Sequence, residues 1–346
     1  MVPIYTRYLP FKLSFFALII GLVIFQPKET QAQDPEYSQF YAAPLHLNPA
    51  FAGTAGYARI NLNFRDQWPS VPQTYLTYSI AYDQFFARAR SGIGIIALGD
   101  DEGQGIQNTI SLSGVYSFNI QFSEKFAMNL GVQGTWIQRR LDWDKLKFFD
   151  QIDPIYGFND AGNNPNPTFE TQPDNNTISF VDFSAGALFF SSKFFGGVAV
   201  KHLSTPQQSW YDDAESTLPI RITGHAGGVI EIGKGREKSK IAPSIMYTQQ
   251  ANFKQLNLGT YFDRNIFYGG FFFRHTFGNS DAVILVAGIN KKVWGIGYSY
   301  DFTISPFAKE TGGAHEISLQ FKLGMNAVKD DKKRIKGTLK CPNILE

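Results

Sequence analysis

The chain has 346 residues, a formal net charge of +2 and a mean hydropathy of −0.18, with 43% hydrophobic and 18% charged residues. This apolar content excludes intrinsic disorder, the near-neutral charge argues against a dedicated nucleic-acid binder, and the mean hydropathy argues against a polytopic helical membrane protein. The single cysteine, Cys341, excludes an intramolecular disulfide and a zinc site made of cysteines alone.

The N-terminus has the pattern of an export signal. Basic residues precede an apolar run at 13–25, which is shorter than the roughly 20 residues of a transmembrane helix but has the length of a signal-peptide core. Small residues follow at Thr30 and Ala32, so cleavage is predicted between Ala32 and Gln33. Residues 1–32 are therefore interpreted as a signal peptide, with a retained membrane anchor as the alternative.

The rest of the chain alternates apolar and polar residues with a period of two, which is typical of β-strands. Most of the alternating segments exceed the usual strand length of about 5–6 residues and reach the roughly 9–11 needed to cross a bilayer at a tilt. One stretch, 81–90, is the best candidate for a short helical turn. Fourteen strands are predicted, at 58–66, 74–83, 91–99, 108–119, 125–140, 178–191, 193–203, 219–232, 239–250, 253–263, 265–276, 281–290, 292–303 and 313–323.

Alternation alone leaves open which face is buried, because a secreted β-sandwich would turn the apolar residues inward. The polar faces are rich in Ser, Thr, Gly and Asn, which suits a wet lumen, and aromatic residues gather near the strand ends, which suits membrane interfaces. An even number of strands closes a barrel and pairs every backbone group in lipid. The predicted fold is all-β, an antiparallel transmembrane β-barrel of about 14 strands in the outer membrane, spanning 58–323.

The connections between the predicted strands alternate in length. If the mature N-terminus is periplasmic, the odd-numbered connections face the cell exterior, and they include the longest, at 141–177 and 204–218. Most even-numbered connections are tight turns. Short periplasmic turns and longer extracellular loops are the arrangement of outer-membrane barrels.

Residues 33–57 precede the first strand and form a periplasmic or lumenal segment. Within it, NPAFAGT (48–54) combines a turn-forming Asn-Pro pair with glycine, which permits positive φ. One interpretation is that this segment plugs or lines the lumen or docks a periplasmic partner, and the other is that it is an entry turn packed below the barrel. Its candidate site residues are Asn48, Pro49, Phe51 and Gly53.

At the other end, 324–346 is predicted to be a periplasmic tail. Its basic run at 329–340 is either solvated or docks an acidic partner or lipid headgroups. Cys341 is interpreted as a free thiol, with a disulfide between chains as the alternative.

Eight segments, in order, resemble the PorP/SprF family of type IX secretion-system outer-membrane proteins of the Bacteroidetes. They run from about 34 to 323 and are DPEYSQFYAAPLHLNPAFAGTAG (34–56), FRDQWPS (64–70), GIGIIALGDDEGQG (92–105), QRRLDWDKLKFFDQID (138–153), GVAVKHLSTPQQSW (197–210), LPIRITGHAGG (218–228), GYSYDFTIS (297–305) and GGAHEISL (312–319). The resemblance implies an outer-membrane protein of the secretion or gliding apparatus. Its partners would be machinery subunits, a large exported adhesin-like client, or both.

The long connection at 141–177 is the expected client contact, because its first half is too apolar for a solvated loop and long structured loops are usually functional. We expect 142–158 to fold over the barrel mouth. The alternative is a self-packed cap that only narrows the pore. The candidate partner-binding residues are Asp142, Trp143, Asp144, Phe148, Phe149 and Asp150, with Trp210 and Tyr211 from the 204–218 loop.

Catalytic and metal-binding motifs are not evident. The sequence contains neither HExxH nor GxSxG, and its acidic clusters do not fit a calcium loop. We therefore expect a protein that is not an enzyme and carries no metal or cofactor. A passive channel or uptake barrel is the alternative to a secretion component, because a barrel of this size has room for a small lumen. Four histidines are considered as metal-binding or catalytic residues, but they lack the paired spacing of such motifs. They are His202, His225, His275 and His315.

Overall fold

The computed structural model describes residues 34–71, 74–211, 216–233, 239–277, 281–304, 312–324 and 341–342. The cleavage predicted between Ala32 and Gln33 lies outside these residues. Within the described part of the chain, no helix is both long enough and apolar enough to cross a membrane.

Almost all of the regular structure is β-strand. β8 and β9 are separated only by Val229 and both pair with β10, so they form one interrupted strand, and the sheet has fourteen strands. The elements are β1 (Ala58–Gln67), β2 (Tyr75–Phe86), β3 (Ser91–Glu102), β4 (Gln107–Gln121), β5 (Ala127–Leu141), β6 (Thr177–Phe190), β7 (Phe194–Lys201), β8 (Arg221–Gly228), β9 (Ile230–Ile232), β10 (Ser239–Gln250), β11 (Phe253–Arg264), β12 (Phe267–Thr276), β13 (Ala282–Asn290), β14 (Trp294–Thr303) and β15 (Ala314–Leu323).

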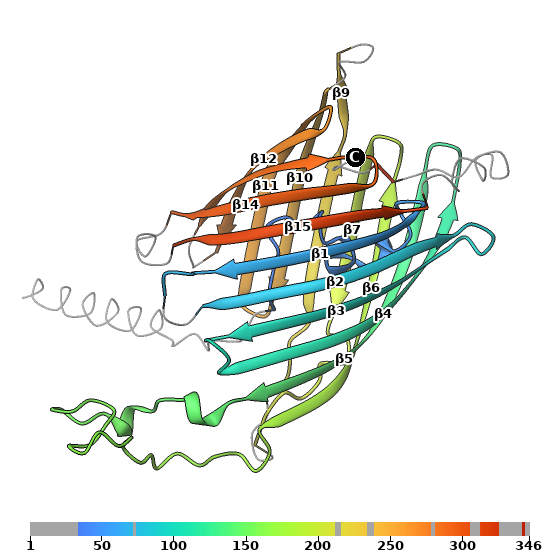
Figure 1. Cartoon of the computed structure of the whole chain (residues 1–346). Coiled ribbons are helices and arrows are strands. Elements are labelled where there is room, and N and C mark those ends of the chain that lie inside the picture. The colour runs from blue at the N-terminus through green and yellow to red at the C-terminus, as the bar shows by residue number, and fades with distance from the viewer. Residues whose placement is uncertain are drawn as a thin grey trace, which may run out of the picture. The chain divides into compact units, whose positions relative to one another are not determined.

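The strands close into a barrel (Figure 1). Each strand pairs antiparallel with its neighbours in the chain, and the ring closes where β15 pairs with β1, from Ala58 opposite Leu323 to Gln67 opposite Ala314. Closure leaves the sheet without a free first or last strand, which is the condition for strands to cross a bilayer. The predicted closed antiparallel barrel of fourteen strands is thus confirmed.

The apolar residues of the strands face outward. Ile80, Ile95 and Leu112 are each at least half exposed, whereas Asn61, Asn63 and other polar residues of the alternate positions are buried inside the barrel. An outward apolar band, called the apolar belt below, is suited to contact with lipid. The β-sandwich alternative, which would bury these apolar residues, is therefore wrong.

The two ends of the barrel differ. One end, the outer mouth, carries the connections 142–176 and 202–220. The opposite end, the inner mouth, carries tight turns such as 265–266 and 291–293. The long connection between β5 and β6 projects from the outer mouth (Figure 1).

The helical turn expected at 81–90 is not formed. β2 continues to Phe86, and only Ala87–Arg90 forms a turn. The strand is extended because 83–86 pair with β3, and because the Asp83 carboxylate, turned into the lumen, binds Arg59. Pairing between strands has overridden the local helical pattern.

A charge placed in the apolar belt is expected to destabilise the barrel. Val132 lies in β5 with its side chain outward and 56% exposed. Val132→Arg should lower the free energy of unfolding in lipid vesicles by about 2–4 kcal/mol, because the guanidinium must enter hydrocarbon. Urea titration followed by tryptophan fluorescence measures the change, with Val132→Leu as the control. Equal stability of the two variants would contradict the lipid-facing assignment.

Candidate functional site

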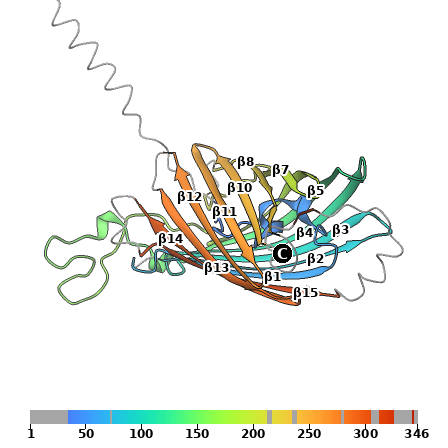
Figure 2. The same cartoon turned by 90° about the horizontal axis from the view of Figure 1, so that it is seen from above.

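Residues 35–57, called the plug below, lie inside the barrel (Figure 2). They contain a short helix, α2 (Pro44–Leu47), and a 3₁₀ turn, η1 (Pro49–Phe51). Proline begins each element, where its missing N–H costs no hydrogen bond, and the Asn48 side chain caps η1 by accepting from the Ala50 N–H at 2.9 Å. The candidate residues Asn48, Pro49, Phe51 and Gly53 therefore all belong to a segment within the lumen.

The plug runs from the outer mouth toward the inner mouth. Glu36 pairs with Arg221, the first residue of β8, and accepts from Gln255 near the start of β11, both at the outer ends of their strands. Gly53 donates its N–H to Asp83 in the inner half of β2 at 2.7 Å. The described chain therefore begins at the outer end of the lumen. The condition of a periplasmic N-terminus is not met, and the exterior position of the outer mouth follows from its longer connections alone.

A buried ion cluster holds the outer part of the plug at Ser38. Arg65 lies 3.0 Å from Asp301 and 3.3 Å from Glu316, and Arg274 lies 2.9 Å from Asp301. The Ser38 hydroxyl donates to Asp301 at 2.6 Å and accepts from both arginines, while its N–H donates to Glu316 at 2.7 Å. Buried charges are tolerated only when paired and hydrogen-bonded, so this part of the lumen depends on the plug being in place.

A second buried ion pair holds the inner part of the plug. Arg59 of β1 donates to Asp83 of β2 at 2.7 Å and to the Phe51 carbonyl at 3.3 Å. The same carboxylate accepts the Gly53 N–H. Gly53 has φ of +73°, a conformation that favours glycine.

Asn48 fastens the middle of the plug to the seam between β6 and β7. Its amide nitrogen lies 3.2 Å from the carbonyl oxygens of Ala187 and Val198 and 3.2 Å from His225 Nε2. The His225 ring stacks on Phe51 at 5.3 Å between centroids. His225 is thus a buried partner of the plug.

Glycines in the barrel allow the plug backbone to approach closely. A Cβ atom at Gly92 would lie 2.1 Å from the Ala52 oxygen, and one at Gly186 would lie 2.1 Å from Asn48 Oδ1. At Gly131 it would lie 2.3 Å from the Ala50 nitrogen. Any residue larger than glycine at these positions would displace the plug.

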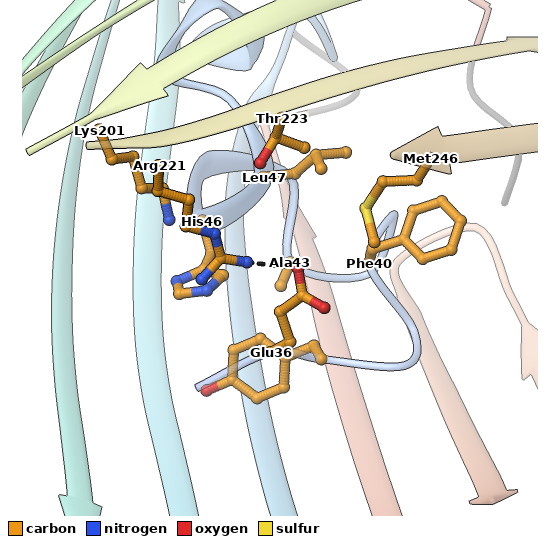
Figure 3. A pocket seen from close by; sticks show the side chains of 10 residues that line it. Glu36, Phe40, Ala43, His46, Leu47, Lys201, Arg221, Thr223 and Met246 are labelled. Carbon is orange, nitrogen blue, oxygen red and sulfur yellow. Dashed lines mark hydrogen bonds and ion pairs between the residues drawn. The ribbon is translucent and has the colours of Figure 1, made fainter. Parts of the chain in front are cut away.

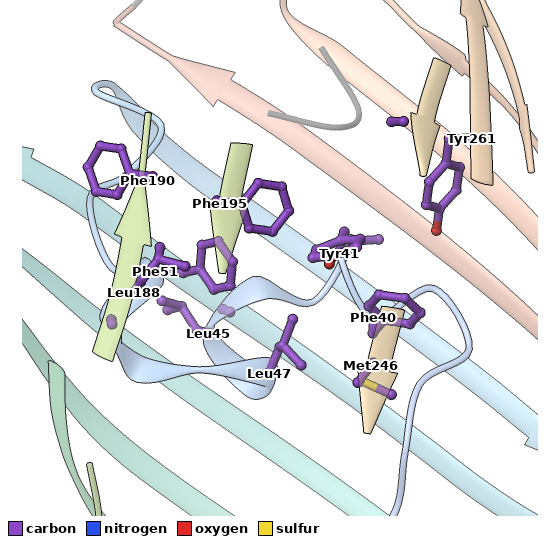
Figure 4. Close-up of a cluster of buried hydrophobic side chains, with 14 of the residues drawn as sticks. Phe40, Tyr41, Leu45, Leu47, Phe51, Leu188, Phe190, Phe195, Met246 and Tyr261 are labelled. Carbon is purple, nitrogen blue, oxygen red and sulfur yellow. The ribbon is translucent and has the colours of Figure 1, made fainter. Parts of the chain in front are cut away.

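Apolar side chains of the plug pack against inward residues of the barrel (Figure 4). Cys341 packs against this cluster as well, so it does not lie in a solvated tail. Burial raises the pKa of its thiol, which keeps it protonated and weakly nucleophilic and favours the free-thiol interpretation. The cluster includes Phe40, Tyr41, Leu45, Leu47, Phe51, Leu188, Phe190, Phe195 and Met246.

Most residues of the plug are buried against the barrel. A cavity of about 20 Å³, with room for about one water molecule, lies between the plug and the strands β7, β8 and β10 (Figure 3). The Glu36–Arg221 ion pair lies at this cavity.

At the outer mouth, Asp142, Trp143 and Asp144 line a polar groove of about 550 Å³ together with 172–177. The Trp143 ring packs on Phe148 at 5.0 Å between centroids. The structure thus brings together four of the candidate partner-binding residues at the start of the long connection.

The middle of the long connection is strongly exposed. Phe149, Ile155 and Phe169 are 90%, 81% and 94% exposed, so the expectation that 142–158 folds over the barrel mouth is wrong. Asp150 orders this region by accepting the Phe169 N–H at 2.6 Å. Backbone hydrogen bonds from Tyr156 and Ile155 lower the pKa of Asp153 below its ordinary value.

The other two candidates, Trp210 and Tyr211, lie in the second outer loop. The Tyr211 hydroxyl donates to the Thr171 carbonyl at 2.6 Å and so joins this loop to the long connection. Trp210 is partly buried, and its indole N–H has no partner among the described residues. Both outer loops therefore contribute to one exposed surface.

The ion cluster around Ser38 was not predicted from the sequence. Its charged members lie on the polar faces of strands that are far apart in sequence. Alternation predicts that these side chains face the lumen, but it does not predict which of them form ion pairs. In the described part of the chain, no group of three or more His, Cys, Asp or Glu side chains is arranged to hold a metal ion.

Displacing the plug is expected to open the barrel. Gly131→Val places a side chain where the Ala50 backbone lies and should produce steady ion conductance in planar bilayers, against near silence for the native chain. The control is Gly114→Val on β4, where a Cβ meets nothing within 4 Å. Silence of both variants would show that the plug does not close the lumen in the way its packing indicates.

Breaking the inner ion pair is expected to destabilise the plugged barrel. Arg59→Met leaves the Asp83 carboxylate buried and without its cation, which should cost about 3–5 kcal/mol in the free energy of unfolding. The double variant Arg59→Met/Asp83→Asn removes the stranded charge and keeps an acceptor for Gly53, so it should regain part of that loss. Urea titrations of both variants measure this, and equal losses would contradict the ion-pair argument.

No curated protein matches the sequence. Among solved structures, the toluene transporter TbuX of Ralstonia pickettii aligns with a TM-score of 0.47 and 11% identity over 81% of this chain and 93% of that chain. BamA from Haemophilus ducreyi, lacking POTRA domains 1–3, aligns with a TM-score of 0.37 and 10% identity over 77% of this chain and 70% of that chain. The KdgM porin aligns with a TM-score of 0.32 and 8% identity over 77% of this chain and 99% of that chain. All three TM-scores are below 0.5.

One protein-family model matches residues 29–321, nearly the whole chain, and describes the type IX secretion system membrane protein PorP/SprF. The match covers the plug and almost all of the barrel. The resemblance drawn from the eight sequence segments is confirmed: the chain belongs to the PorP/SprF family of type IX secretion-system membrane proteins.

Proposed function

We propose that this outer-membrane barrel is a non-enzymatic holder of exported proteins for the type IX secretion system. In this role it binds an exported client at the outer mouth and secretion-machinery subunits at the inner mouth. The filled lumen carries the proposal, because a barrel whose interior is occupied by its own N-terminal segment acts through its surfaces. Family membership supplies the secretion pathway.

The same observation argues against the passive-channel alternative. The plug is anchored at Glu36, Ser38, Asn48 and Gly53 by contacts distributed along the lumen. Buried, hydrogen-bonded ion pairs are costly to separate. Spontaneous displacement of the plug is therefore a rare event, and passage of a solute would require it.

The outer surface supports client binding. Phe149, Ile155 and Phe169 point away from the rest of the protein on a loop that is otherwise ordered by hydrogen bonds. Exposed apolar side chains framed by polar ones are typical of protein interaction sites. The loop thus keeps apolar contact residues available at the cell surface.

Removing these apolar contacts is expected to reduce client display without harming the barrel. The double variant Phe149→Ser/Phe169→Ser changes side chains that pack against little in the free protein. Each buried aromatic contact in an interface contributes on the order of 1–2 kcal/mol, so surface-exposed exported protein should fall at least about tenfold. Surface proteolysis with quantitative mass spectrometry measures this.

The control is Phe149→Leu/Phe169→Leu, which keeps both positions apolar and should retain most of the display. Barrel abundance in the outer membrane should be the same for both variants. Normal display by the serine variant would rule out these two side chains as client contacts.

A further inference from the structure

The outer half of β6 has an unpaired edge. The β6–β7 register runs only from Ala185 opposite Val200 to Phe190 opposite Phe195, although β6 begins at Thr177 and pairs with β5 over its whole length. Among the described residues, the other strands pair on both sides to within a few residues of their outer ends.

The direction of the backbone groups follows from the pairing. Asn176 accepts from Leu141 of β5, so even-numbered residues of β6 face β5 and odd-numbered ones face the open side. Phe183 accepts from Leu203, and the Thr177 N–H donates to the Asn175 side chain. Four backbone groups on the open side have no hydrogen-bond partner within the described chain. They are the Val181 N–H, the Ser179 N–H and carbonyl, and the Thr177 carbonyl.

Among the described residues of the neighbouring loop, Ser204 alone forms a hydrogen bond to the Thr177–Val181 edge. After Leu203 and Ser204, whose hydroxyl reaches the Val181 carbonyl at 3.4 Å, the loop turns toward the lumen, where Gln208 accepts from Arg139. Ser179 is exposed. The edge begins at Val181, level with the outward Trp136 of the apolar belt, and continues away from the lipid.

From this edge we propose that β6 takes an extended segment of an exported protein as an added strand along Thr177–Val181. This deepens the proposed function, on which it rests. An open edge presents donors and acceptors at the spacing of a strand and recognises any extended backbone. Its position beyond the apolar belt, at the mouth with the long loops, selects a partner on the exterior side rather than a neighbour within the bilayer.

A polar groove on the β5 side of the start of β6 shares Thr177 with the open edge, and its charges indicate the side chains that flank the added strand. It is lined by Arg140 and by three carboxylates, of which Asp142 forms an ion pair with Lys145 at 3.6 Å. Asp144 and Asp174 have no ion-pair partner in the described part of the chain. The occupant is therefore an extended segment that carries Lys or Arg next to its strand.

The test uses proline at a position where the barrel tolerates it. Ser179→Pro removes an N–H that faces only the open edge and leaves the β5–β6 pairing intact. Ser179→Ala keeps the N–H and changes only the side chain. A photocrosslinking amino acid at Val181 in the full-length chain, activated in intact cells, reports the neighbour of the edge, and mass spectrometry identifies the crosslinked peptide.

The expected result is a crosslink to one extended, basic segment of an exported protein, equal in native and Ser179→Ala chains and about tenfold weaker in Ser179→Pro. Equal crosslinking in the proline and alanine variants, a crosslink to a machinery subunit or no crosslink would overturn strand addition. Display lost in Phe149→Ser/Phe169→Ser but kept in Ser179→Pro would reject this inference alone. Normal display in both would reject the proposed function too.

Discussion

The structure depends on how the charges inside the barrel are paired. Strands that turn apolar residues to lipid turn polar ones inward, and among these are Arg65, Asp301 and Glu316. In a narrow lumen such groups need partners, because a buried charge without one is strongly unfavourable. The plug supplies part of the hydrogen bonding through Ser38, so the polar lumen and the N-terminal segment require each other.

The plug also explains the small residues of the barrel. Glycines on β3, β5 and β6 leave space for its backbone, and Asn48 reaches through to carbonyl groups at the β6–β7 seam. The register between β6 and β7 is shorter than the one between β6 and β5. The same seam therefore binds the plug on the inside and leaves an open strand edge at the outer mouth, which connects the two parts of the site physically.

A filled lumen moves function to the surfaces. The outer mouth combines exposed aromatic residues with a polar groove, and the two outer loops are joined by the hydrogen bond from Tyr211 to Thr171. Exposed apolar groups provide affinity through burial, whereas a strand edge provides alignment through directional hydrogen bonds. A protein that holds an extended client benefits from both.

The barrel, its fourteen strands and the family were predictable from the sequence, because alternation with period two is a local property and eight ordered segments are specific. It left the plug and an entry turn as equal possibilities, and it wrongly predicted a helical turn at 81–90 and a loop folded over the mouth. These points depend on contacts between distant parts of the chain. The ion partners of Ser38 and the neighbours of Asn48 lie on strands far apart in the chain, and the open edge of β6 arises from the stagger of its neighbours, which no local pattern records.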